Sequence, residues 1–284
     1  MYKLIIQAPE IATQNLKRLA QLCGASEISA VRVGQLAHQA FKLRAAEPGS
    51  QAAVAAFCAE AGYDYAFVAH DARLADIGLV VMDMDSTLIT IECIDEIADM
   101  QGIKEQVAAI TARSMRGELD FRQSLTERVA LLAGLEESAL ERVYTERLQL
   151  MPGAQTLLKA VSGVGARTLL ISGGFTFFTE RLQAKLGLSR AIANVLEVVD
   201  GRLTGRIVGD IVDAQRKADE LARYQAELGL CREQVIALGD GANDLLMLAA
   251  AGFGIACHAK PKVKAEAAFA LDQTGLDGVL GYFD

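Results

Sequence analysis

Continuous apolar runs recur along the C-terminal part of the chain, and polar residues follow each of them. The runs are IGLVVMD (77–83), ARTLLIS (166–172), QVIALGD (234–240) and GFGIAC (252–257), with helix-favouring stretches between them. A strand that is apolar on both sides is typical of a parallel sheet covered by helices on both faces. The alternation therefore predicts a doubly wound, Rossmann-like α/β domain with a parallel sheet.

The first 75 residues show a different pattern. Strand-like YKLII is followed by helical TQNLKRLAQL, extended segments from about 28 to 45, helical QAAVAAFCAEAG and strand-like YDYAFVA. This order predicts a small β-α-β-β-α-β unit of the ferredoxin-like α+β type. We therefore expect two domains, at 1–75 and 76–284, and the first contains no visible catalytic motif.

A charged, helix-favouring stretch at about 92–150 separates the first two apolar runs of the larger domain. It is too long for an ordinary crossover and lacks strand signals. Because ligands of open α/β sheets bind outside the carboxyl ends of the strands, we expect this insertion to form a helical cap over that edge. Residues 194–212 predict a β-hairpin with Asp200-Gly201 as its turn.

The composition and net charge of the chain exclude some classes of binding partner. The chain has 284 residues, 52% of them hydrophobic, and a net charge of −8, so neither nucleic acid nor an anionic membrane is an expected partner. Its five cysteines form no C-x-x-C pair and lie mostly in apolar settings, which is typical of reduced thiols. No signal peptide is evident and the longest apolar run, 245–257, is too short to span a bilayer. We therefore expect a cytoplasmic protein.

Polar clusters follow three of the predicted strands. They are Asp83 with Asp85, Ser172-Gly173-Gly174, and the GDGAND segment with Asp240, Asn243 and Asp244. In a parallel sheet such strand ends converge, although an Asp pair taken alone is more often a cap or a turn. Together the aspartates offer the hard oxygen ligands that Mg²⁺ prefers, and the cation would neutralise charges that otherwise repel.

A phosphate site is expected beside these carboxylates. Ser172 and the glycine amides after it, at a predicted strand-to-helix turn, can donate hydrogen bonds to phosphate oxygens, although Ser172 could also simply cap the next helix. Lys217 lies near the start of a predicted helix and supplies a cation. The combination favours chemistry on a phosphoryl group.

These elements resemble the haloacid dehalogenase (HAD) superfamily of phosphatases. Asp83-Met84-Asp85-Ser86-Thr87 matches the superfamily's Asp-x-Asp-x-Thr loop in full. The resemblance implies that Asp83 attacks phosphorus and becomes an aspartyl phosphate, and that Asp85 acts as general acid and then base. It also implies that Lys217 neutralises charge, that Asn243 and Asp244 order the cluster, and that Mg²⁺ is bound by Asp83, Asp240 and the backbone carbonyl of Asp85.

Within the superfamily, the spacing of IECIDE (91–96), MRGELDFRQSLTERV (115–129) and ISGGF (171–175) is similar to that of the phosphoserine phosphatases. The resemblance implies that Glu92 binds the substrate ammonium and Arg128 its carboxylate. Cap contacts then fall on Met115 and Phe121, both also expected in the core. The resemblance implies further substrate contacts from Ser172, Gly173 and Asn243, and hence hydrolysis of O-phospho-L-serine, the last step of serine biosynthesis.

Several alternatives stay open at this point. Glu92 and Arg128 could be solvated helix residues, and Arg113, Arg116 and Arg122 compete with Arg128 for the carboxylate. The same motifs would serve a phosphotransferase acting on another alcohol such as homoserine, or a phosphatase for another small phosphomonoester. The N-terminal unit resembles ACT-like domains, with a regulatory or dimerising role, and a homodimer through it is open. A third hypothesis makes the chain an amino-acid sensor with a vestigial α/β domain.

Overall fold

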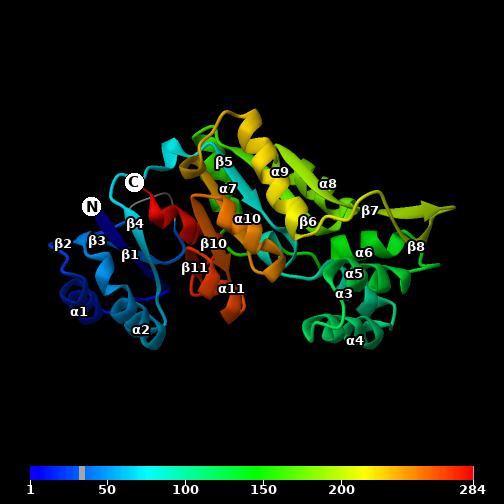
Figure 1. Cartoon of the computed structure of the whole chain (residues 1–284), viewed down its shortest axis with the longest axis horizontal. Helices are drawn as coiled ribbons and strands as arrows, with labels where there is room; N and C mark the ends of the chain where they lie inside the picture. Colours follow the sequence, from blue (N-terminus) through cyan, green and yellow to red (C-terminus); the bar gives the residue numbers. More distant parts are fainter. Residues whose placement is uncertain (32–35, 284) are drawn as a thin grey trace.

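The computed structural model describes residues 1–31 and 36–283, and its two sheets each carry their own helices (Figure 1). Part of the extended segment predicted at 28–45 falls on residues 32–35, outside the described residues. A four-stranded sheet lies near the N-terminus and a seven-stranded sheet occupies the rest of the chain. The three predicted polar clusters follow strands of the larger sheet, so the candidate functional site is expected at the carboxyl ends of those strands.

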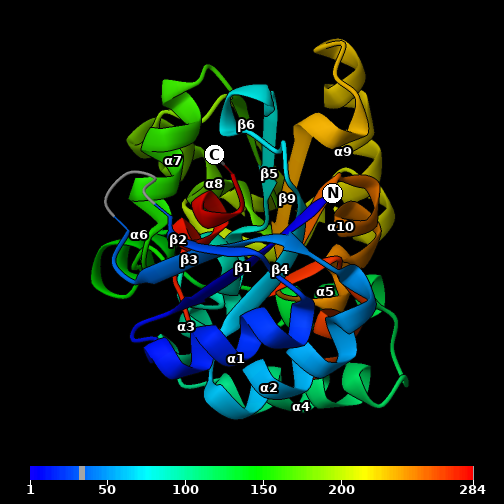
Figure 2. The same cartoon turned by 90° about the vertical axis from the view of Figure 1, so that its left-hand side faces the viewer.

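The N-terminal unit has the predicted element order. Its antiparallel sheet runs in the order β2-β3-β1-β4, and both helices cover one face of it (Figure 2). The strands are β1 (Tyr2–Ala8), β2 (Glu27–Ala30), β3 (Gln39–Ala46) and β4 (Asp64–Ala69), and the helices are α1 (Thr13–Cys23) and α2 (Gln51–Ala61).

The two faces of this small sheet are buried against different partners. On β1, Leu4 and Ile6 pack with the apolar residues of α1 and α2. Ile5, which points to the opposite face because side chains alternate along a strand, belongs to the core of the larger domain together with Tyr282 and Phe283. The N-terminal unit is therefore packed onto the C-terminal end of the chain through a shared apolar core.

A buried carboxylate adds hydrogen bonds to this apolar interface. Asp64, at the start of β4, is only 5% exposed. Its side chain accepts hydrogen bonds from the backbone N–H groups of Asp272, Gln273 and Thr274, at 2.7 to 3.1 Å, and from the Thr274 hydroxyl at 2.9 Å. The two donors of Thr274 are buried and would have no acceptor without Asp64, so this one residue fixes the segment that precedes the C-terminus.

Replacing Asp64 with alanine should therefore destabilise the protein. Each buried donor left unpaired costs about 1–3 kcal/mol, so we expect a loss of at least about 3 kcal/mol in the free energy of unfolding. Urea unfolding would measure it. Asp71→Ala is the matched control, because the Asp71 side chain is 77% exposed and surface changes usually stay within about 0.5 kcal/mol. Equal unfolding midpoints for the two variants would contradict the docking role of Asp64.

The larger sheet runs in the order β11-β10-β9-β5-β6-β7-β8. All neighbouring pairs are parallel except β7 with β8, which form the hairpin predicted around Asp200-Gly201. Both turn residues have positive φ, at 51° and 73°, as a tight hairpin turn requires. The strands are β5 (Leu79–Met82), β6 (Arg167–Phe175), β7 (Arg190–Val199), β8 (Arg202–Val208), β9 (Val235–Gly239), β10 (Phe253–Cys257) and β11 (Phe269–Leu271).

Helices cover both faces of this sheet, as the apolar strands predict. On β5, Leu79 and Val81 pack with residues of α9 (Ala214–Glu227), α10 (Leu245–Ala250) and α11 (Pro261–Glu266). Val80 and Met82 point to the other face and pack with α7 (Ala154–Gly163), α8 (Thr176–Leu186) and the C-terminal turn Leu276–Tyr282. The domain is therefore a doubly wound α/β fold.

The long insertion between β5 and β6 is helical, as predicted. Its helices are α3 (Cys93–Met100), α4 (Lys104–Met115), α5 (Phe121–Ala130) and α6 (Ser138–Glu146). They gather at one end of the larger sheet, beside β7 and β8 (Figure 1). Backbone hydrogen bonds link them to β8, from Gly134 to Leu203 and from Leu203 to Leu135. This position brings the helices over the carboxyl ends of the strands.

The helices of the described residues differ from membrane-spanning helices in length or in apolar composition. None of the helices within residues 1–31 and 36–283 combines the length and the apolar composition needed to cross a bilayer.

Candidate active site

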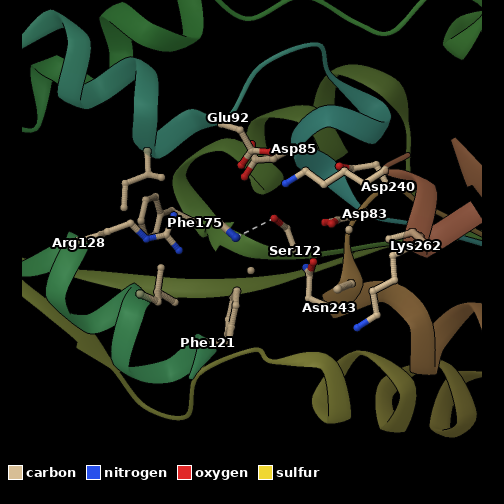
Figure 3. A pocket seen from close by; sticks show the side chains of 18 residues that line it. Asp83, Asp85, Glu92, Phe121, Arg128, Ser172, Phe175, Asp240, Asn243 and Lys262 are labelled. Atoms are coloured by element: carbon tan, nitrogen blue, oxygen red, sulfur yellow. Dashed lines mark hydrogen bonds between the residues drawn. The ribbon is translucent and has the colours of Figure 1, made fainter. Parts of the chain in front are cut away.

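A cavity of about 310 Å³ opens where β5, β6 and β9 end, beneath the helical insertion (Figure 3). These three strands are neighbours in the sheet, so the polar residues that follow them converge. Nine of the predicted site residues line the cavity: Asp83, Asp85, Glu92, Phe121, Arg128, Ser172, Gly173, Asp240 and Asn243. Lys217 lies behind the wall, and Met115 lies outside it.

The two aspartates of the first cluster reach the cavity through a tight turn. Asp83 directly follows β5, and its Oδ1 accepts a hydrogen bond from the Met84 backbone at 2.7 Å. In an extended segment, two carboxylates separated by one residue would lie on the same side, but here the chain turns at Met84–Leu88 and Ser86 has a φ of 54°. The turn buries Met84 and Thr87 and still presents both carboxylates to the cavity.

Lys217 is fully buried behind Asp83 and bridges two carboxylates. Its Nζ lies 2.7 Å from Oδ2 of Asp83 and 2.7 Å from Oδ1 of Asp244. Burial opposes the charged form of the lysine, but the two carboxylates outweigh it and raise the pKa of Lys217. The lysine therefore holds a positive charge against Asp83.

Three carboxylates crowd together beside this lysine. Oxygen atoms of Asp83, Asp240 and Asp244 all lie within 4.8 Å of one another. Burial and the charge of Asp244 raise the pKa of Asp240 to about 6, although the Thr87 hydroxyl donates to it at 2.9 Å. The pKa of Asp83 is also raised, first by burial and then by Asp244. One lysine leaves negative charge in excess here, so the cluster fits a hard cation.

The Ser172 segment differs from the predicted turn. β6 continues to Phe175 with an irregular register after Ile171, so Ser172 lies within the strand. The Gly174 amide donates to the Ser172 hydroxyl at 2.8 Å (Figure 3). A Cβ at Gly174 would meet Asp85 at 2.8 Å, so a larger residue there would displace this carboxylate. The irregular end of β6 thus forms the cavity wall that faces Asp85.

Asp85 is tied to the first turn of α3. Its Oδ1 accepts a hydrogen bond from the Cys93 backbone at 3.2 Å. Burial, and then the nearby charge of Glu92, raise the pKa of Asp85 to about 7. A carboxyl group with such a pKa can both give and take a proton near neutral pH. The geometry is therefore suited to proton transfer beside Asp83.

Two cap residues of opposite charge complete the cavity. Glu92 precedes α3 at the rim, and Arg128 comes from the last turn of α5 (Figure 3). Desolvation lowers the pKa of Arg128, while Asp95, Glu92 and Asp85 act against that shift. The cavity thus holds a cation and an anion on the side of the cap.

The structure separates Arg128 from the other arginines considered for the same role. Arg113 pairs with Glu127 at 2.6 Å, Arg116 with Glu118 at 2.6 Å, and Arg122 with Asp213 at 2.6 Å. None of these three lines the cavity. Their ion pairs lie on the surface, which the spacing of charges along the helices could not distinguish from a position facing the site.

The expectation that Met115 packs in the core is wrong. Its side chain is 70% exposed, because Met115 ends α4 and the buried side of that helix is carried by Val107. Met115 also does not line the cavity, so this arrangement gives no support to a substrate contact. Phe121 does line it, and its ring packs close to Gly173.

Sequence reasoning missed one wall of the cavity. Lys260, Lys262 and Val263, at the start of α11, line it, and Figure 3 shows Lys262 on the side opposite Arg128. They follow β10, whose carboxyl end lies at the same edge of the sheet as those of β5, β6 and β9. The segment HAKPKVK could have predicted this wall, because polar residues that follow the fourth parallel strand must lie at the same edge of the sheet as the other clusters.

The fold and the site define a haloacid dehalogenase-like hydrolase. The family model with that description matches residues 80–249. A phosphoserine phosphatase of Polaromonas sp. is 50% identical over 215 residues, which cover 74% of this chain and 91% of that relative. The chain belongs to the phosphoserine phosphatase family of haloacid dehalogenase-like hydrolases.

Solved structures agree with this assignment. The unliganded form of a probable phosphoserine phosphatase from Vibrio cholerae has a TM-score of 0.84 and 38% identity, over 99% of this chain and 85% of that one. A substrate-bound phosphoserine phosphatase has a TM-score of 0.69 and 37% identity, over 73% of this chain and 99% of that one. About a quarter of this chain therefore has no counterpart in the second structure. The ACT-like character of residues 1–75 stays a prediction.

Proposed function

We propose that this protein hydrolyses O-phospho-L-serine to L-serine and inorganic phosphate in a Mg²⁺-dependent reaction. The observation that carries the proposal is the placement of Glu92 and Arg128 in the same cavity as Asp83 and Asp85. Phosphoserine has a phosphate at one end and an ammonium and a carboxylate at the other. The cavity offers a matching group for each of the three.

The cation would be held by Asp83, Asp240 and the backbone carbonyl of Asp85. Asp244 belongs to the same acidic cluster, but its oxygens already accept from Lys217 and from the backbone N–H groups of Asp240 and Gly241. Asp244 thus serves better to position Lys217 and the turn after β9. When bound, Mg²⁺ supplies neutralisation of the phosphoryl oxygens.

In the first step, Asp83 attacks phosphorus and the bond from phosphorus to the seryl oxygen breaks. Asp85 donates its proton to that oxygen, so serine leaves as a neutral alcohol and an aspartyl phosphate remains. In the second step, Asp85 removes a proton from water, which attacks phosphorus and releases phosphate from Asp83. Lys217, 2.7 Å from Asp83, offsets negative charge in both steps.

The remaining groups would orient the two ends of the substrate. Ser172, the Gly173 amide and Asn243 line the cavity near Asp83 and would donate hydrogen bonds to phosphate oxygens. Phe121 would close the cavity on the cap side. Such positioning and charge neutralisation account for most of the catalysis of phosphoryl transfer.

Phosphate release from a panel of phosphomonoesters, with and without Mg²⁺, would test the proposal. Phosphoserine should be the preferred member, and chelation of the metal should remove the activity. The same assay with added homoserine would reveal phosphotransfer, because phosphohomoserine would then form in place of part of the free phosphate. Equal rates with sugar phosphates or nucleotides would contradict the assignment of phosphoserine.

Substrate preference should depend on Arg128. A guanidinium can bind a carboxylate through two parallel hydrogen bonds, which a lysine cannot reproduce. We expect Arg128→Lys to lower kcat/KM for phosphoserine by about thirtyfold, because the lysine keeps the charge but loses one hydrogen bond to the carboxylate, and a hydrogen bond to a charged group contributes about 1.5–3 kcal/mol. Turnover of p-nitrophenyl phosphate, which lacks the carboxylate, should fall much less, and Glu92→Gln should show the same bias through the ammonium.

Arg116→Lys provides the matched control for Arg128→Lys. Arg116 lies in the same cap, but its side chain is 59% exposed and pairs with Glu118. We expect this control to leave kcat/KM for both substrates close to the unmodified values. A parallel fall for both substrates in Arg128→Lys would mean that Arg128 supports the fold instead of recognising the carboxylate.

A further inference from the structure

Ser86 has a backbone conformation that its side chain does not favour. Its φ is 54° and its ψ is 3°, in the left-handed region where a Cβ atom is unfavourable. The residue stands in the turn between the two carboxylates and Thr87, where glycine would adopt this conformation without strain. A non-glycine residue in such a place is a reason to ask what its side chain does.

The Ser86 side chain reaches across the turn to the cap. Its Oγ donates a hydrogen bond of 2.8 Å to Oε1 of Glu92, and its backbone N–H donates to the carbonyl of Ile91 at 3.2 Å. Within residues 1–31 and 36–283, no other hydrogen-bond donor contacts the Glu92 carboxylate. Both bonds run from the loop that carries Asp83 and Asp85 to the residues just before α3.

We propose that Ser86 is a positioning residue for Glu92 and thereby determines recognition of the substrate ammonium. The inference rests on the proposed function, because it assigns Glu92 to that ammonium. Glu92 lies at the solvent-exposed rim of the cavity, where a long side chain samples several rotamers. The bond to Oε1 fixes the carboxylate before the substrate arrives and leaves Oε2 to receive the ammonium.

Holding the carboxylate in advance lowers the entropic cost of binding. A hydroxyl donor also favours the ionised form of the carboxylate, which is the form that attracts a cation. The same loop carries Asp83 and Asp85, so the distance between the phosphoryl site and the ammonium site is set within ten residues of chain, from Asp83 to Glu92. Ser86 thus connects the loop that binds the phosphoryl group to the residue that binds the ammonium.

Two substitutions separate the hydrogen bond from the backbone strain. Ser86→Ala removes the hydroxyl and keeps the strain, whereas Ser86→Gly removes both. The substrates are phosphoserine and 3-(phosphonooxy)propanoate, which keeps the phosphate and the carboxylate and has hydrogen in place of the ammonium. The readout is the ratio of kcat/KM for the two, which a general loss of folded enzyme does not change.

We expect this ratio to fall about tenfold in both variants, the size of one hydrogen bond to a charged group. Thr90→Ala is the control, because Thr90 is an exposed hydroxyl residue of the same loop whose contact is the Gln149 carbonyl, and it should keep the ratio. In a Glu92→Gln background, Ser86→Gly should lower the ratio little further, because the two residues act through one contact.

An unchanged ratio in both Ser86 variants would overturn the inference, and so would a fall confined to Ser86→Ala, which would point to strain. A full further fall in the Glu92→Gln background would also overturn it, since Ser86 would then act independently of Glu92. Failure of the proposed function looks different. In that case the unmodified protein itself would turn over both substrates with equal efficiency.

Discussion

Replacing Asp83 with asparagine should reduce phosphate release to background. An amide can neither attack phosphorus nor supply negative charge to the metal site, and removal of a nucleophile typically costs on the order of 10⁴–10⁶ in rate. The fold should survive, because asparagine has nearly the same shape and Lys217 keeps its ion pair with Asp244 at 2.7 Å. Phosphate release and circular dichroism would measure the two expectations.

A trapping experiment sharpens this test. Beryllium fluoride with Mg²⁺ should form an acyl-phosphate mimic on Asp83 of the unmodified protein and none on the asparagine variant. Asp210→Asn is the control, because Asp210 is exposed and does not line the cavity. Near-normal turnover in the Asp83 variant would exclude this residue as the nucleophile.

Replacing Asp85 with asparagine should lower turnover of phosphoserine by about 10²–10⁴, the usual cost of losing a positioned acid and base. Mg²⁺ affinity should change little, because the proposed ligand from this residue is its backbone carbonyl. Titration calorimetry would measure the affinity. A lost affinity with unchanged turnover would reverse the roles proposed for the carboxylate and the carbonyl.

The leaving group distinguishes the two proton transfers assigned to Asp85. Nitrophenolate leaves without a proton, so the Asp85 variant should still form the aspartyl phosphate from p-nitrophenyl phosphate and then stall, because water is no longer activated. We expect a burst of about one nitrophenol per enzyme with that substrate. Phosphoserine should give no burst, since its alkoxide cannot leave unprotonated. A burst with both substrates would contradict the acid role.

The amino-acid sequence alone was sufficient to predict the fold class, the family resemblance and the main chemical groups. Apolar runs that are buried on both sides predict a parallel sheet, and a helix-favouring insertion predicts a cap, because these patterns are local. The Asp83 to Thr87 motif is local as well, and β9, β5 and β6 lie side by side as the convergence of the three clusters requires. Resemblance, more than spacing, pointed to Glu92 and Arg128.

Which side chains face the cavity could be seen only in the packed structure. Helical spacing could not separate Arg128 from the three arginines that pair on the surface, nor could it show that Met115 is exposed. Three further features were not predicted from the sequence. They are the hydrogen bond from Ser86 to the Glu92 carboxylate, the cavity wall formed by α11, and the docking of the N-terminal unit through Asp64. Each depends on the rotation of a helix, the path of a turn or a contact between residues far apart in the chain, and these are fixed only when the elements pack.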